Sequence, residues 1–144
     1  AEARALVTEN LRNGKALEKF KVFVASQGGN PAVVDDYSLM PQASRQQEVL
    51  AEATGYVTEI VADDIGVAAM LLGAGRATKE STIDLSAGLK ILKKVGDPVR
   101  KGEAIVRMFA NKADFGQAEK LIQEAYSIGE EQKEITLIHS VILD

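Results

Sequence analysis

The chain has 144 residues, 46% of them hydrophobic and 26% charged, which fits one well-buried domain or one domain with part of another. Its net charge of −4, with no block of basic residues, argues against a surface for nucleic acid or for an anionic membrane. It has no cysteine, which excludes disulfides, thiolate catalysis and sulfur-ligated metals, and no apolar run approaches the roughly 18 residues that cross a bilayer.

Two amphipathic helices are predicted in the first 29 residues. Their apolar side chains recur every three or four residues, and Asn13-Gly14 separates the two repeats. The second helix should end at Gly28-Gly29, and a turn-rich connection then runs from Pro31 to Pro41. These short helices would leave their apolar faces exposed if they stood alone, so we expect them to belong to a larger body. The apolar residues are Leu6, Val7, Leu11, Ala16, Leu17, Phe20, Phe23 and Val24.

From Arg45 onward the apolar residues alternate as they do in a strand. The alternation is strongest in residues 55–61, GYVTEIV, which are entered through a glycine. Asp63 or Asp64 can cap a helix that follows and continues to Leu72. The pattern therefore changes from helical to mixed at about this point in the chain.

Short strands and turns fill the next part of the sequence. We expect one strand over residues 83–85 and another over 89–95. Gly96-Asp97-Pro98 and Lys101-Gly102-Glu103 predict two sharp turns. A further strand is predicted over 104–110.

A helix and a strand are predicted in the last thirty residues. Asn111 or Asp114 can cap the helix, and Gly129 should close it. Residues 135–143 then alternate again as a final strand. The order of elements predicts an α+β unit with mostly antiparallel, turn-linked strands. The apolar stripe of the helix is Phe115, Ala118, Leu121, Ile122 and Ala125.

A glycine-rich loop, GAGRATKE, occupies residues 73–80 after the predicted central helix. A phosphate loop of the nucleotide-binding kind places its glycines after a strand and before a helix, where free amide groups point at the anion. Gly73 and Gly75 instead follow a helix, at the end where the dipole is negative and unpaired carbonyls gather. We interpret them as a helix stop and turn, from which Arg76 and Lys79 could reach an anion held by another part of a larger protein.

The remaining titratable residues do not form an active site in the sequence. The adjacent acids Asp35-Asp36, Asp63-Asp64 and Glu130-Glu131 are best explained as helix caps and solvated turns. His139 is the only histidine, and its apolar neighbours predict a half-buried strand position rather than a catalytic base or metal ligand. One histidine without cysteine does not predict a zinc site.

The segment KKVGDPVRKGEAIVRM, residues 93–108, resembles the paired-turn hairpin of barrel-sandwich carriers such as biotinyl and lipoyl domains. Gly96 and Gly102 would form the turns, and Val95, Val99 and Ile105 would fill a small core. Those carriers present a modifiable lysine between methionines, and no Met-Lys-Met occurs here. A free-standing binding or carrier-like module without that lysine hairpin stays the alternative hypothesis.

Five collinear segments carry a second resemblance. They are GKALEKFKVFVASQGG, GYVTEI, GVAAMLLGAGRATKE, IDLSAGL and KKVGDPVRKGE. Together they resemble the C-terminal third of bacterial pyrimidine-nucleoside phosphorylases and, more distantly, thymidine phosphorylases. The resemblance implies an α/β-hammerhead, a barrel-sandwich-like antiparallel sheet with an inserted helix, over residues 41–144. Residues 1–40 would be the terminal helices and linker of the family's central α/β domain.

The resemblance also implies an activity. Enzymes of this family look like homodimers in which phosphate attacks C1′ of a pyrimidine nucleoside and releases the base and a pentose 1-phosphate. Their phosphate motif K-H-S-x-G-G-V-G-D, their base-binding residues and any potassium ligands lie upstream of the matching region. None of these motifs occurs here, so no catalytic, substrate-binding or metal-binding residue can be assigned. We expect a detached C-terminal portion, also because the chain begins with Ala1, and we expect it to be inactive alone. A cytoplasmic location is expected for this chain, since the absence of cysteine fits a reducing compartment.

For the 73–80 loop the resemblance implies a position near the catalytic cleft of the complete enzyme. The hypothesis is that Gly73 and Gly75 let the loop move when the domains close. Arg76 and Lys79 would add positive charge on the substrate side.

Overall fold

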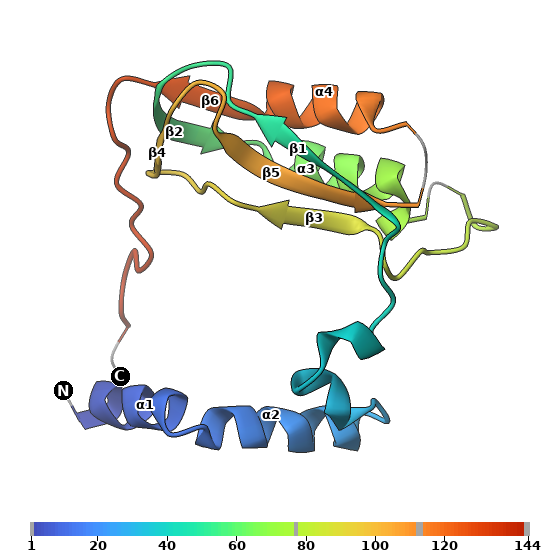
Figure 1. Ribbon diagram of the computed structural model, residues 1–144. Helices are drawn as coiled ribbons and strands as arrows, with labels where there is room; N and C mark the ends of the chain where they lie inside the picture. The colour runs from blue at the N-terminus through green and yellow to red at the C-terminus, as the bar shows by residue number, and fades with distance from the viewer. Residues whose placement is uncertain (1, 77, 112–113, 143–144) are drawn as a thin grey trace. The chain divides into compact units, whose positions relative to one another are not determined.

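The computed structural model describes residues 2–76, 78–111 and 114–142 (Figure 1). The chain divides into two compact units, Ala1–Pro41 and Gln42–Asp144. None of the helices in the described ranges is long and apolar enough to cross a membrane.

The smaller unit contains the two predicted helices, α1 (Glu2–Arg12) and α2 (Lys15–Ser26). Gly14, with φ of 81°, turns the chain between them, and the Gly29 amide donates to the Val24 carbonyl at 2.9 Å to close α2. Two 3₁₀ turns follow, η1 (Pro31–Val34) and η2 (Tyr37–Leu39). Both predicted helices and the turn-rich connection are therefore confirmed.

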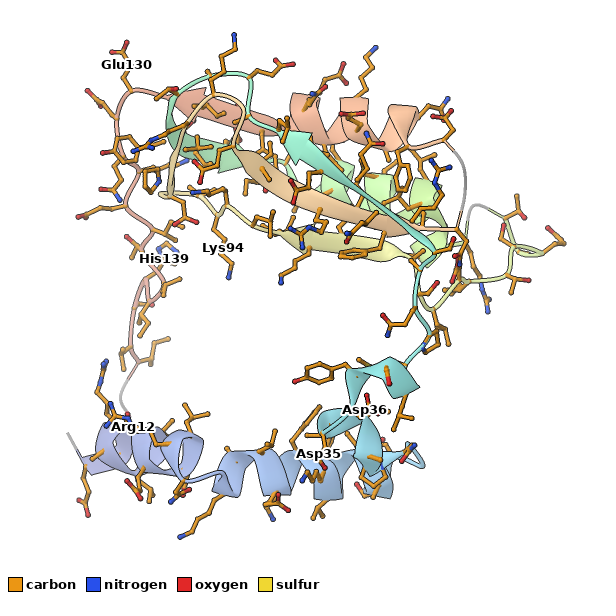
Figure 2. The ribbon with its side chains drawn as sticks, viewed as in Figure 1. Arg12, Asp35, Asp36, Lys94, Glu130 and His139 are labelled. Carbon is orange, nitrogen blue, oxygen red and sulfur yellow. The ribbon has the colours of Figure 1, made fainter. Side chains whose placement is uncertain are left out.

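Two aspartates, Asp35 and Asp36, stabilise the turns of this unit (Figure 2). Lys21 on α2 lies 2.9 Å from an Asp35 oxygen and 3.0 Å from a Glu18 oxygen. Asp36 accepts from the amide and hydroxyl of Ser38 at 2.9 and 2.6 Å, and these bonds lower the pKa of its carboxyl. The interpretation of this acidic pair as turn and cap residues is confirmed.

The apolar faces of α1 and α2 are not covered within their unit. Neither helix has a buried residue. The side chains most exposed are Leu6, Val7, Leu11, Leu17, Phe20, Val22 and Phe23, each at least 47% exposed. The expectation of uncovered faces on these helices is confirmed.

Two three-stranded antiparallel sheets form the frame of the larger unit. The first has the order β1–β5–β3, with β1 at Arg45–Leu50, β5 at Ala104–Ala110 and β3 at Gly88–Ile91. The second has the order β4–β2–β6, with β4 at Pro98–Val99, β2 at Gly55–Ile60 and β6 at Tyr126–Gly129. The α+β class and the antiparallel pairing are confirmed.

Two helices pack side by side against these sheets (Figure 1). Helix α3 (Ala62–Ala69) runs on into a π-helical turn, η3 (Met70–Ala74), and α4 (Gly116–Ala125) contacts β1 and β6. The core combines residues from sheets and helices, and the central strand β5 contributes buried residues from both of its faces. The fully buried apolar residues are Val49, Val57, Ala68, Val106, Met108, Ala110, Ile122 and Ala125.

The helix starts differ from the expected caps. Val61 is the N-cap of α3 and makes no side-chain cap bond, while Asp63 and Asp64 lie in the first turn, where their charge favours the helix dipole. Asp114 accepts from the Gly116 amide at 2.8 Å, although the N-cap position of α4 belongs to Phe115. Assigning α3 a carboxylate cap was therefore wrong.

Two predicted strands between α3 and the turns are also wrong in part. Residues 83–85 form no strand, because the Asp84 carboxylate and carbonyl close a turn with the amides of Ser86 and Ala87, leaving Leu85 81% exposed. The next strand ends at Ile91 rather than Val95. The amides of residues 92 and 93 both donate to the Ile105 carbonyl, at 2.9 and 3.2 Å, so the regular ladder stops there.

The C-terminal prediction is wrong in a different way. The chain turns directly from α4 into β6, whose Tyr126 ring is buried and whose hydroxyl donates to the Lys93 carbonyl at 2.9 Å. Residues 130–142 form neither helix nor strand, and Leu143 of the predicted strand lies outside the described residues. His139 is exposed instead of half-buried (Figure 2), because no strand edge in the described unit covers this segment.

Candidate functional site

The two glycines of the 73–80 loop are required for different physical reasons. Gly73 has φ of 113°, a conformation that L side chains rarely adopt, and it ends the helix as the sequence predicts. Gly75 has extended backbone, but a Cβ there would lie 3.1 Å from the Met70 Cβ. One glycine therefore provides the turn, and the other lets the chain pass close to the helix it has just left.

A carboxylate, Asp84, holds the far side of this loop. Its amide donates to the Gly73 carbonyl at 2.9 Å, and one carboxylate oxygen accepts from the amide and hydroxyl of Ser86 at 2.9 and 2.6 Å. The other oxygen accepts from the Asn111 side chain at 2.8 Å, and the Asn111 side-chain oxygen accepts from the Ser44 amide at 2.9 Å. The loop is thereby tied to the ends of β5 and β1.

These hydrogen bonds fix the charge of Asp84. The Ser86 hydroxyl, then the Ser86 amide and then the Asn111 amide lower the pKa of the Asp84 carboxyl, since each donor favours the ionised form. Sequence reasoning missed this network and assigned Asn111 to a helix cap. The available signal was Asp84-Leu85-Ser86, an Asp followed two residues later by Ser, which is typical of a side-chain-closed turn.

Arg76 and Lys79 are both exposed on this loop. Neither has an ion-pair partner among the described residues, so both charges are free to meet an external anion. Thr78 and Ser81 close the turn that contains Lys79, because the Thr78 amide donates to the Ser81 hydroxyl at 3.0 Å. A hollow of about 330 Å³ lies behind the loop, lined by Met70, Leu72, Gly73, Gly75, Ser81, Thr82 and Asp84.

The loop can attract an anion but has no group to carry out a reaction on it. No base faces Arg76 or Lys79 in the described contacts, and Asp84 is held in its ionised form by donors. In the described part of the chain, no three His, Asp or Glu side chains converge in a way that could hold a metal ion. The site can therefore position charge, and any reacting groups must come from elsewhere.

The carrier-like hairpin has the predicted geometry. Gly96 and Gly102 adopt φ of 92° and 83° at the two turns, Val99 and Ile105 are buried, and Val95 is partly buried against the core. Lys93 lies 2.6 Å from a Glu103 oxygen and donates to the Pro98 carbonyl at 2.9 Å. This contact, followed by the Arg100 amide, lowers the pKa of the Glu103 carboxyl.

The connection between β2 and β3 separates this fold from a carrier. A carrier presents its modifiable lysine in a tight turn there, whereas this chain places α3, the π-helical turn and the 73–80 loop between the two strands. The exposed lysines of the hairpin, Lys94 and Lys101, lie after β3 and not in this connection. The geometry gives no support to a carrier function.

The family model described as "Pyrimidine nucleoside phosphorylase C-terminal domain" matches residues 56–129, from β2 to the end of β6. The chain belongs to this family. The match includes the hairpin, the 73–80 loop and both helices of the larger unit. The resemblance found in the five collinear segments is confirmed, and the free-standing carrier is not favoured.

Curated relatives extend the match to nearly the whole chain. The pyrimidine-nucleoside phosphorylase of Bacillus subtilis (strain 168) is 52% identical over 143 residues, which are 99% of this chain and 33% of that protein. Those of Staphylococcus aureus strains MSSA476 and USA300 are each 46% identical over the same shares. The chain thus spans about a third of the length of these relatives.

Proposed function

We propose that this chain is the C-terminal part of a pyrimidine-nucleoside phosphorylase, which converts a pyrimidine nucleoside and phosphate into a base and a pentose 1-phosphate. The observation that carries the proposal is the 52% identity over 143 residues to an enzyme with that printed name. The chain covers 33% of that enzyme, and the proposal assigns the groups that hold both substrates to the other part. The 144-residue chain alone is inactive.

The proposal extends to the architecture of the whole enzyme. The larger unit is an α/β-hammerhead, supported by two antiparallel sheets with α3 inserted between β2 and β3. Helices α1 and α2 complete the central α/β domain, supported by their uncovered apolar faces. The complete enzyme is a cytoplasmic homodimer that binds phosphate, and potassium where it is used, upstream of this chain.

The 73–80 loop faces the cleft in this proposal. Gly73 and Gly75 let it adjust when the cleft closes, while Arg76 and Lys79 draw the phosphate and the nucleoside toward the reacting groups. Support comes from the exposure of both cations and from their lack of described ion-pair partners. The Asp84 network keeps the base of the loop in place during this movement.

The activity is tested by joining the chain to the first two thirds of the Bacillus subtilis relative, which it matches at 52% identity. We expect the chimera to release uracil or thymine from uridine or thymidine only when phosphate is present. The 144-residue chain, purified in parallel, should release none. A folded chimera without phosphorolysis, or an active isolated chain, would contradict the proposal.

The loop is tested in the same chimera. Arg76→Ala and Lys79→Ala should each raise KM for phosphate roughly 1.5- to 5-fold, the effect expected from losing one exposed charge interaction. Lys90→Ala is the matched control, since Lys90 is exposed on β3 and makes no described ion pair. If Arg76→Ala leaves kcat and KM unaltered, the loop does not act on the substrates.

A further inference from the structure

Residues 134–142, EITLIHSVI, form an exposed apolar segment after β6. Its apolar side chains are among the most exposed in the described chain: Ile135 54%, Leu137 87%, Ile138 73%, Val141 71% and Ile142 89%. Exposed apolar side chains are ordinary when scattered, but a continuous group marks a surface that another body covers.

The backbone of this segment has no partner in the described structure. Residues 132–135 line a shallow hollow with residues 95–97, and the last described hydrogen bond to the rest of the unit comes from the Gln132 side chain, which donates to the Gly96 carbonyl at 2.9 Å. Beyond it, no hydrogen bond of residues 134–142 to a described residue is found. Figure 2 shows His139 on this extended stretch, which Figure 1 draws without an arrow. A row of free amide and carbonyl groups therefore accompanies the apolar side chains.

The order of side chains tells what kind of partner fits. In an extended chain, Ile135, Leu137 and Val141 lie on one face, which is interrupted only by His139. The other face is mixed, because Ile138 and Ile142 alternate there with polar side chains. A strand with one apolar and one mixed face is typical of an antiparallel sheet that packs one face on a core, as β1 does through Val49.

Three features thus coincide in residues 134–142: an apolar face, free backbone groups and no described strand beside them. We propose that residues 134–142 join, as a strand, the edge of a sheet in the part of the phosphorylase outside this chain, with the face of Ile135, Leu137 and Val141 turned toward its core. The inference rests on the proposed function. It is supported by the coverage of the relatives, of which this chain spans 33%. Hydrogen bonding to that edge would satisfy the free amides, and the core behind the sheet would bury the apolar face of Ile135, Leu137 and Val141.

Amide hydrogen exchange, resolved by NMR, tests the strand directly. In the 144-residue chain the amides of residues 134–142 should exchange at nearly unprotected rates. In the chimera with the Bacillus subtilis relative, alternate amides should be protected about 100-fold or more, because an edge strand points every second N–H at its neighbour. Absence of protection in the chimera overturns the proposal. Concentration-dependent protection in the isolated chain also overturns it, because the partner would then be a second copy.

Proline substitution at adjacent positions provides a second test in the chimera. Leu137→Pro and Ile138→Pro remove neighbouring amides, of which only one would pair with the sheet edge. One variant should therefore lose amide protection along 134–142, while the other keeps most of it. Equal loss in both would mean that apolar side chains dock without a strand ladder, and the proposal would be wrong.

The two proposals fail separately. A chimera with alternating protection but no phosphorolysis would contradict the activity and leave the strand standing. An active chimera whose 134–142 amides exchange freely would contradict the strand and leave the activity standing.

Discussion

Replacing Gly73 by alanine tests the turn that ends the central helix. At φ of 113° and ψ of −1°, an L residue is strained whatever space surrounds it. The space itself is sufficient, since an added Cβ would meet the Asp84 and Ala87 Cβ atoms at 3.5 and 3.7 Å, which is ordinary contact. The cost is therefore conformational, and Gly73→Ala should lower the free energy of unfolding by about 1–2 kcal/mol.

Gly66 provides the matched control in the same helix. It lies within α3, its φ is not positive, and nothing stands within 4 Å of an added Cβ. Gly66→Ala should therefore raise the free energy of unfolding by about 0.5–1 kcal/mol, because alanine loses less backbone entropy in a helix. The same chemical change should thus have opposite signs seven positions apart.

Native-state hydrogen exchange gives the free energy for the larger unit alone. Val106 and Met108 are fully buried on β5, the central strand of its sheet, so their amides report global opening. We expect Gly73→Ala to speed their exchange roughly 5- to 30-fold, which corresponds to about 1–2 kcal/mol. If Gly73→Ala changes nothing while Gly66→Ala slows exchange, the left-handed turn does not exist and the reasoning fails.

Three further predictions concern single residues of the larger unit. Gly55→Ala should destabilise the fold by about 3 kcal/mol, because its Cβ would overlap the Gly129 carbonyl oxygen; a wild-type urea midpoint would refute that close approach. Burial raises the pKa of the Tyr126 hydroxyl to about 12, against about 10 in an unfolded chain. The stabilisation linked to this hydroxyl is complete below about pH 10 and is lost toward pH 12. Urea denaturation at several pH values over that range should therefore show the free energy of unfolding of the wild type falling by about 1–2 kcal/mol more than that of Tyr126→Phe. An equal pH dependence of the two proteins would refute this burial. Ser86→Ala should raise the pKa of Asp84 toward its ordinary value, since the hydroxyl is the main donor to that carboxylate; an unchanged NMR titration of the Asp84 carboxyl would remove the serine from that role.

Elements with a strong local signal could be predicted from the sequence. Residues 55–61 alternate cleanly and contain β2, and the stripe from Phe115 to Ala125 marks α4. The strand β6 could not be predicted, because its four residues carry little pattern and depend on the neighbouring edge of β2. Its register, with Val57 opposite Ile128, is a tertiary property.

The candidate site could be predicted from the sequence only in part, for the same reason. The helix stop at Gly73 follows from local glycine chemistry, and so does the need for a residue without a Cβ at Gly75, beside Met70. The Asp84–Asn111 bond joins positions 27 residues apart in sequence, and the Asn111–Ser44 bond joins positions 67 apart. Neither pairing is encoded by spacing, because β5 must first lie between β1 and β3 for these side chains to meet.

The failed strand over 135–142 shows why a correct pattern can give a wrong element. Alternation states which side chains would share a face, but a strand also needs a neighbouring edge that accepts its hydrogen bonds. Within the described chain that edge is absent, so the pattern produces only an extended, exposed segment. Because the face of Ile135, Leu137 and Val141 is apolar, the proposed edge belongs to a sheet that packs at least one face on a core. An apolar pattern that the described fold does not bury is therefore evidence about the partner. Protection of the amides of residues 134–142 from hydrogen exchange in the chimera is the measurement that tests for that partner.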